Sequence, residues 1–183
     1  VLSVYSTSDP HSGVQEVEIP EGVEIIGSYA FQDCDGLTKV TFPSTLTTIE
    51  ESAFRYCDGL EGVEFPEGLK TIEIHAFTAC SSLTEVEVPG SVETLGDYAF
   101  EECENLKEIT LNDGLVSVGR NFIGGTAVTE LAVPKTVTDM SYALYGAQNL
   151  KKVSFEEGME KIPDSVLSVY STSDPHSGVQ EVE

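Results

Sequence analysis

Four cysteines recur at one spacing, and thiols have more chemistry open to them than any other group in this chain. They lie 23 residues apart, at Cys34, Cys57, Cys80 and Cys103. We expect buried free thiols acting as small hydrophobic groups, because the same position is later filled by Thr126, Ala147 and Tyr170. Disulfides between neighbouring repeats stay open as an alternative. A metal site is disfavoured because one ladder cannot arrange four sulfurs tetrahedrally.

Histidine and serine offer little for catalysis. His176 stands beside Asp174 and Ser173 in the stretch STSDPHSG at 171–178, and His75 stands apart from them. A triad needs a nucleophile, a base and an orienting group held on rigid elements, and proximity along the chain does not supply that. The sequence therefore predicts a protein that is not an enzyme, with no cofactor and no dedicated metal site.

Glutamates form the second candidate group. We predict a binding face made by five of them, which fall at equivalent positions of successive repeats: Glu64, Glu85, Glu87, Glu108 and Glu130. Like charges on neighbouring strands repel, so a weakly held divalent cation or a basic partner would stabilise the group. The alternative is a solvated acidic face that keeps the protein soluble. No calcium-loop motif accompanies the glutamates.

The overall charge limits the kinds of partner that the protein can bind. The chain has 183 residues, with 32 acidic and 9 basic side chains and a net charge of −23. Such a surface repels phosphate backbones and anionic lipid, so we expect no nucleic-acid partner. No apolar run approaches the roughly 20 residues that span a bilayer, so we expect no membrane insertion.

These residues are positioned by an internal repeat that covers the whole chain. The sequence divides into seven aligned segments: 14–36, 37–59, 60–82, 83–105, 106–127, 128–149 and 150–178. Each begins with an apolar residue and continues with two inward positions spaced by two, which predicts a short strand, and five segments place a proline after it. A second pair of apolar positions and a recurring Ala-Phe pair complete the segment. The Ala-Phe stretch predicts a helical or 3₁₀ turn.

One such segment cannot fold alone. Its roughly seven buried apolar groups contribute about 1.5–3 kcal/mol each, whereas ordering each residue costs about 1–2 kcal/mol. Stacking on neighbouring segments closes the core, as in a solenoid. Four residues share the column before the alanine: Tyr29, His75, Tyr98 and Tyr142. They are open to partner contact or to ordinary packing.

The first and last eighteen residues are identical. Residues 1–18 and 166–183 both read VLSVYSTSDPHSGVQEVE. We therefore interpret 1–13 as the tail of a preceding rung, 14–178 as a seven-rung block with a period of 165 residues, and 179–183 as the first strand of the next block. Neither end has the polar character of a capping repeat. The expectation is a covalent array or a head-to-tail stack whose partner is another copy of itself.

The repeat L-x-x-V-x-[IFV]-P-x-x-[VL]-x-x-[IL]-x-x-x-A-F-x-x-C resembles the BspA-type leucine-rich repeats, a 23-residue class of microbial surface proteins. The match is most specific over the first four segments and weakens in NFIGGT at 121–126 and ALYGA at 143–147. The resemblance implies a right-handed leucine-rich-repeat solenoid with a parallel β-sheet on its concave side and short helical turns opposite. It also implies an extracellular or cell-surface location and a role in adhesion or recognition.

Two functions follow as expectations. The first is a non-enzymatic structural protein, a segment of a long filament or stalk at a microbial surface. The alternative is an adhesin-type module that binds an extracellular matrix protein or a glycan on its curved face. The outward strand positions carry no aromatic residue, which favours the structural role. A designed repeat protein is a third possibility, but the irregular fifth to seventh segments do not fit an idealised consensus.

Overall fold

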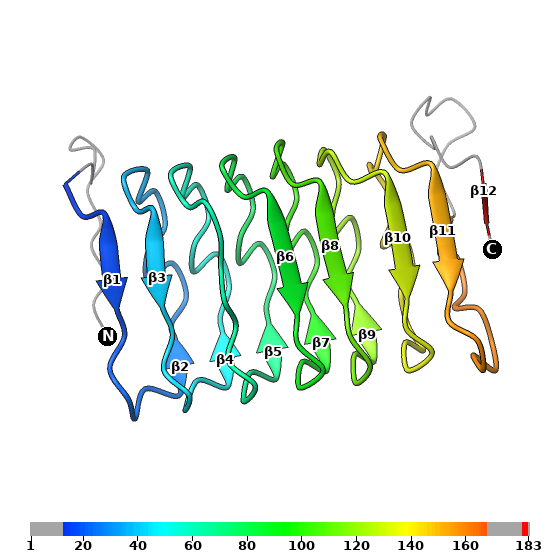
Figure 1. The fold of residues 1–183 in the computed structure, drawn as a ribbon, viewed down its shortest axis with the longest axis horizontal. Coiled ribbons are helices and arrows are strands. Elements are labelled where there is room, and N and C mark those ends of the chain that lie inside the picture. Colours follow the sequence, from blue (N-terminus) through cyan, green and yellow to red (C-terminus); the bar gives the residue numbers. More distant parts are fainter. Residues whose placement is uncertain (1–12, 168–180, 183) are drawn as a thin grey trace.

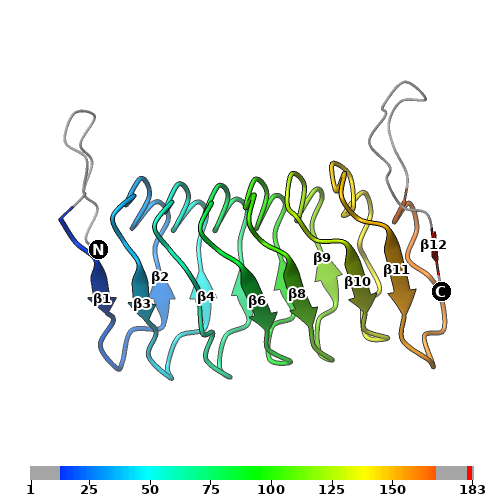
Figure 2. The ribbon, with the colours of Figure 1, turned by 45° about the horizontal axis from the view of Figure 1, so that its top comes forward.

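The computed structural model describes residues 13–167 and 181–182, and these residues form a parallel β-solenoid wound as a right-handed coil (Figure 1). One face, here called the long-strand face, carries β1 (Glu16–Glu18), β3 (Lys39–Thr41), β6 (Glu85–Val88), β8 (Glu108–Leu111), β10 (Glu130–Val133), β11 (Lys152–Phe155) and β12 (Glu181–Val182). The opposite, short-strand face carries β2 (Ile25–Ile26), β4 (Thr48–Ile49), β5 (Thr71–Ile72), β7 (Thr94–Leu95) and β9 (Ser117–Val118). Figure 2 shows the two faces running along the same axis. The predicted solenoid is confirmed.

Strand register follows the repeat length. Glu16 pairs with Lys39 and Thr48 with Thr71, each 23 residues apart. The spacing falls to 22 between β10 and β11, and it rises to 29 between β11 and β12. These separations equal the lengths of the aligned segments, so each strand that is paired lies beside its own counterpart in the neighbouring rung.

The core consists of columns that run along the axis. Phe31, Phe54, Phe77 and Phe100 stack face to face, with ring centroids 5.0, 5.1 and 5.5 Å apart. All but Phe31 are fully buried. Each ring covers its neighbour's apolar face, so no rung closes its core without the next.

The segment expected to be a helical turn is instead a pair of tight turns, and the described residues contain no helix. Its first residue has a left-handed backbone in every rung, from Tyr29 at φ 59° to Ser165 at φ 55°. A left-handed residue ends helical continuation. It also points the N–H along the axis: Tyr29 N donates to the Glu51 carbonyl at 2.9 Å and His75 N donates to that of Asp97 at 2.9 Å. These bonds between rungs offset the conformational cost.

The two strand faces differ in continuity. On the short-strand face β2, β4, β5, β7 and β9 form one five-stranded sheet. The long-strand face is divided into β1–β3, β6–β8 and β10–β11–β12. The first interruption is the third rung, where residues 61–65 form no strand (Figure 1). The second lies between β8 and β10. The long-strand face is therefore the less uniform surface.

Candidate functional site

The five predicted glutamates lie on the long-strand face and are exposed. Glu85 and Glu108 stand directly opposite one another in the β6–β8 register. Glu87 is in the same strand as Glu85 and faces Thr110. Glu130 faces Lys152, and Glu64 belongs to the interrupted third rung. The structure thus brings Glu64, Glu85, Glu87 and Glu108 to one surface; their role in binding stays a prediction.

A hollow of about 1050 Å³ lies over the first interruption. Val63 and Phe65 in the third rung and Phe42 beside them are half-buried side chains packed against the core. The glutamates at 64, 85, 87 and 108 line the hollow with Glu16 and Lys39. It therefore combines apolar side chains that are partly accessible with a mostly anionic rim.

A smaller hollow of about 410 Å³ coincides with the second interruption, between β8 and β10. Glu108 and Glu130 line it, and so do Lys107 and Lys152. Charges here are mixed, in contrast to the first hollow. Each break in the long-strand ladder is thus matched by a depression in the surface.

Neighbouring charges divide the long-strand face into balanced and unbalanced places. Lysine faces glutamate at Glu16–Lys39 and at Glu130–Lys152. Glu85 and Glu108 face each other, and Glu87 accepts a hydrogen bond from Asn112 Nδ2 at 3.0 Å. Over the described part of the chain, no group of three or more His, Cys, Asp or Glu side chains is placed to hold a metal ion.

The four cysteines are free thiols. Cys57, Cys80 and Cys103 are fully buried, and each thiol donates to a phenylalanine carbonyl of the preceding rung at 3.1 Å. Cys34 is half-buried. Burial raises the pKa of Cys34, Cys57 and Cys80 above the ordinary thiol value. A buried neutral thiol is a poor nucleophile, so this ladder serves packing.

The aromatic column before each alanine lies along the turns. Tyr29, His75, Tyr98 and Tyr142 are half-buried. His75 and Tyr98 stack with centroids 4.7 Å apart. Burial lowers the pKa of His75, which favours the neutral ring. Ordinary packing between rungs accounts for the His75–Tyr98 pair.

Sequence reasoning missed a polar network on the turn side. Asn121 is only 6% exposed and its Nδ2 donates to Glu101 Oε1. Burial raises the pKa of Glu101. The Arg55 guanidinium lies 4.7 Å from the ring centroid of Tyr56. The usable signal was that Asn121 takes the column position held elsewhere by tyrosine, histidine or serine.

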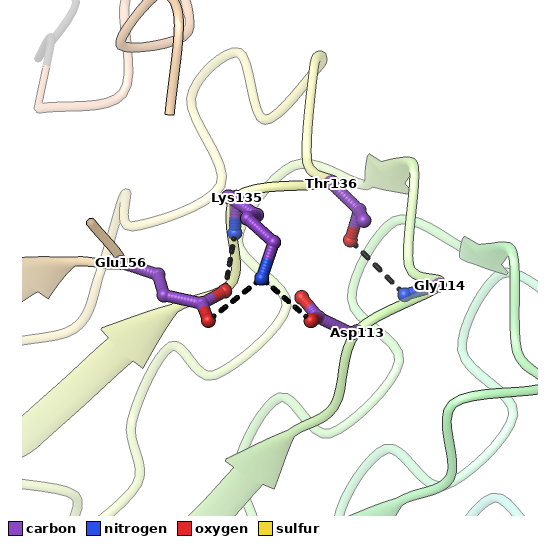
Figure 3. A network of polar contacts seen from close by, with 5 residues as sticks. All are labelled: Asp113, Gly114, Lys135, Thr136 and Glu156. Atoms are coloured by element: carbon purple, nitrogen blue, oxygen red, sulfur yellow. Dashed lines mark hydrogen bonds and ion pairs between the residues drawn. The ribbon is translucent and has the colours of Figure 1, made fainter. Parts of the chain in front are cut away.

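A second missed cluster joins three rungs at the turns that follow the strands (Figure 3). Lys135 Nζ donates to Asp113 Oδ2 and to Glu156 Oε1, both at 2.9 Å. The Lys135 backbone N–H also donates to Glu156 Oε2 at 3.0 Å. The bonds to Asp113 and Glu156 raise the pKa of Lys135, and the bonds from Lys135 lower that of Glu156. Because it bridges rungs, this cluster stabilises stacking.

Two expectations from the sequence concern residues outside those that the structure describes. They are the loop at 171–178 with His176, and Tyr170 as a member of the cysteine column. In the described part of the chain, no helix has the length and apolar character required to cross a membrane.

Comparison with known families identifies the repeat. The model of the BspA type leucine rich repeat region matches in six copies, over residues 10–120 and 72–174. These ranges include most of the chain. This chain belongs to the BspA-type leucine-rich repeat family. None of the curated proteins matches it.

Solved structures of other bacterial repeat proteins are similar to this BspA-type chain. The Treponema pallidum leucine-rich repeat protein TpLRR is 29% identical, with a TM-score of 0.60, over 76% of this chain and 59% of that one. The pneumococcal vaccine antigen PcpA is 26% identical, with a TM-score of 0.72, over 85% of this chain and 44% of that one. A leucine-rich cell surface protein of Faecalibacterium prausnitzii, 22% identical with a TM-score of 0.55 over 94% of this chain and 60% of that one, shows the fold alone. This chain thus spans about half of each of these proteins.

Proposed function

We propose that this BspA-type chain is a segment of a non-enzymatic, extracellular structural protein, built as a long array of seven-rung blocks. The observation that carries the proposal is the pairing of β12 with β11. β12 lies within residues 179–183, which repeat the sequence of residues 14–18. A strand with the sequence of the first rung therefore pairs with the seventh-rung strand in parallel register, as β1 pairs with β3 and β10 pairs with β11.

The charges at the paired positions favour the pairing of β11 with β12. Lys152 of β11 pairs with Glu181, and the equivalent Glu16 of β1 pairs with Lys39 on its other side. In an array, each glutamate of this kind would stand between two lysines of adjacent rungs. Opposite charges on neighbouring strands stabilise a sheet, whereas like charges destabilise it. The register of Lys152 with Glu181 supports the proposed stacking of a first rung on a seventh.

Location and the lack of catalytic function are supported by the family. One structurally similar protein is described as a cell surface protein. In the described residues the thiols of Cys57, Cys80 and Cys103 are buried and His75 is packed against Tyr98. An acidic solenoid of this kind would act through its length and its charge.

The test is electron microscopy of the native protein, with the same measurement on a recombinant chain of several blocks. We expect straight or gently curved filaments with an axial repeat of seven rungs, about 34 Å at ~4.8 Å per rung. A chain with twice the number of blocks should be twice as long. Separate compact particles linked by thin connections would contradict the proposal.

Recognition on the long-strand face is the second candidate, and the two hollows over its interruptions favour it. A regular sheet used only for length has no need of depressions. The test is binding of the single block to immobilised matrix proteins and glycans, compared with a Glu85→Gln/Glu87→Gln variant. Binding that the variant retains in full would place recognition elsewhere.

A further inference from the structure

The third rung leaves backbone groups unused on the long-strand face. In residues 61–65 the one cross-rung backbone hydrogen bond runs from the N–H of Glu61 to the carbonyl of Thr38, at 3.4 Å. Residues 62–65 make none to either neighbour. β3 pairs with β1 alone, and β6 pairs with β8 alone. The backbone ladder of the long-strand face is therefore missing at the third rung.

Apolar side chains reach the surface at the same place. Val63 and Phe65 are half-buried, whereas their counterparts in the next rung, Val86 and Val88, are 3% and 0% exposed. Gly62 holds the outward position that is lysine or glutamate in the adjoining rungs, and a Cβ there would meet nothing within 4 Å. The space above the third rung is therefore open down to an apolar floor.

Carboxylates surround this floor. Glu61 and Glu64 come from the third rung itself, and Glu85 and Glu87 come from β6 beside it. The chain's net charge of −23 adds long-range attraction for cations. A ligand that fits has positive charges spaced around an apolar group and is extended enough to follow the hollow of about 1050 Å³.

We propose that the hollow over the third rung binds an extended, positively charged peptide segment of another protein. One apolar side chain of that segment packs on Val63 and Phe65, and its lysine or arginine side chains pair with Glu64, Glu85 and Glu87. This inference rests on the recognition function proposed above and names its partner.

Other occupants fit less well. A metal ion would lack a cluster of three donors among the described residues. Nucleic acid is repelled by the carboxylates. A small polycation would use the rim but leave Val63 and Phe65 in contact with water. The apolar floor therefore selects a peptide.

The experiment measures binding of a dye-labelled probe peptide, dye-Lys-Lys-Phe-Lys-Lys-amide, to the single 183-residue chain by fluorescence anisotropy at low salt. In an extended peptide the phenylalanine and the two outer lysines lie on one face, as the proposal requires. We expect saturable binding that weakens as salt is added. Glu85→Gln/Glu87→Gln should weaken it by about fivefold, since each exposed ion pair contributes modestly. Gly62→Val places a side chain in the open space and should weaken it by a similar factor. The control Glu24→Gln/Glu160→Gln removes two exposed carboxylates from the short-strand side and should leave the affinity within about twofold.

Several outcomes would overturn the inference. The first is equally tight binding of Lys-Lys-Ser-Lys-Lys or of spermine, which lack the apolar side chain. The second is unchanged binding in both hollow variants when thermal unfolding shows that both are folded. The third is no binding of the probe at all. If the chain binds a matrix protein or glycan and Glu85→Gln/Glu87→Gln weakens that binding, but the probe peptide does not bind, the peptide inference is wrong and the recognition function stands. If neither the probe nor any matrix protein or glycan binds, the inference and the recognition function are both wrong.

Discussion

At the scale of single residues, the cysteine column shows how position decides chemistry. Cys57, Cys80 and Cys103 are fully buried and donate to carbonyls, whereas Cys34 in the first rung is half-buried. The thiolate is the reactive form, and burial raises the pKa of Cys34, Cys57 and Cys80. Four chemically identical residues should therefore differ in reactivity.

We predict that a disulfide reagent at pH 8 modifies one thiol of the native chain readily and the other three only on unfolding. The Cys34→Ser variant should lose the fast phase, and the matched Cys80→Ser variant should keep it. The measurement is the time course of release of the reagent's own thiol as the protein's cysteines react, with and without guanidinium chloride. Four equally fast thiols in the native state would show that the column is open to solvent.

The raised pKa of the buried thiols predicts how the free energy of unfolding depends on pH. The folded state holds the thiol protons more tightly than the unfolded chain, whose thiols titrate near about 8.5. The contribution of the buried thiols is therefore full below that pH and decreases as the pH rises above it. Unfolding by urea at pH 7 and pH 10 should show this loss, and replacing Cys57 and Cys80 by alanine should reduce it.

At the scale of the elements, contacts between rungs matter more than contacts within a rung. Lys135 joins Asp113 and Glu156 from the rungs on either side (Figure 3). The Lys135→Ala variant should lower the melting temperature at low ionic strength, because the two carboxylates then lack their shared cation. At about 1 M salt, where charges are screened within about 3 Å, the difference should disappear.

Lys161 provides the matched control for this prediction. It pairs with Asp164 three residues away in the same rung, at 2.9 Å, and both side chains are at least 70% exposed. Exposed pairs of this kind contribute little. Lys161→Ala should therefore leave the melting temperature unchanged at either salt concentration. An equal effect of the two substitutions would argue against a special role for bridging rungs.

Two glycines should respond in opposite ways to alanine. Gly114 has φ 122°, and a Cβ there would overlap the carbonyl oxygen of Gly90. Gly114→Ala should destabilise the fold by about 1–3 kcal/mol or more. Gly62→Ala meets open space and should be neutral or stabilising by up to about 1 kcal/mol. Urea unfolding of both variants checks the pair, and equal losses would contradict it.

At this scale the sequence predicted the buried columns but not the conformation of the turns or the break in the strand ladder. The columns of Phe54, Phe77 and Ile72 could be assigned because inward positions recur at a fixed spacing and burial depends on that spacing. The prediction of a helical turn is wrong at these left-handed positions because tyrosines such as Tyr29 and Tyr98 are not residues that mark positive φ. The ladder break at Gly62 was missed because it depends on distances between backbones.

For the candidate site, the sequence predicted which residues face each other but not how exposed the neighbouring apolar side chains are. The register placed Glu85 opposite Glu108 correctly, since a repeat of known length fixes which strands meet. The sequence could not reveal that Phe65 and Val63 are partly accessible in the third rung. Their counterparts Val86 and Val88 follow the same pattern and are buried. Phe42 after β3 and Phe155 in β11 are half-buried as well, so the exposure of this column varies from rung to rung in a way that the shared pattern does not encode.

At the scale of the whole molecule, stability should depend on how many rungs are joined. In a solenoid each rung contacts only its neighbours, so the interfaces between rungs add up along the axis. β12 pairs with β11, and its sequence repeats that of β1. Two blocks joined without a linker should therefore behave as one longer solenoid.

We predict that a chain with the 165-residue period repeated twice unfolds in urea with a higher midpoint and a steeper dependence than one block, because more surface is exposed in one step. The control carries a flexible Gly-Ser linker inserted after Gly178, the last residue of the period, which separates the two solenoids without changing their rungs. The control should unfold like a single block. Identical curves for the direct and the linked chains would mean that the seventh and first rungs do not stack, and the proposed array would then lack the joint on which its length depends.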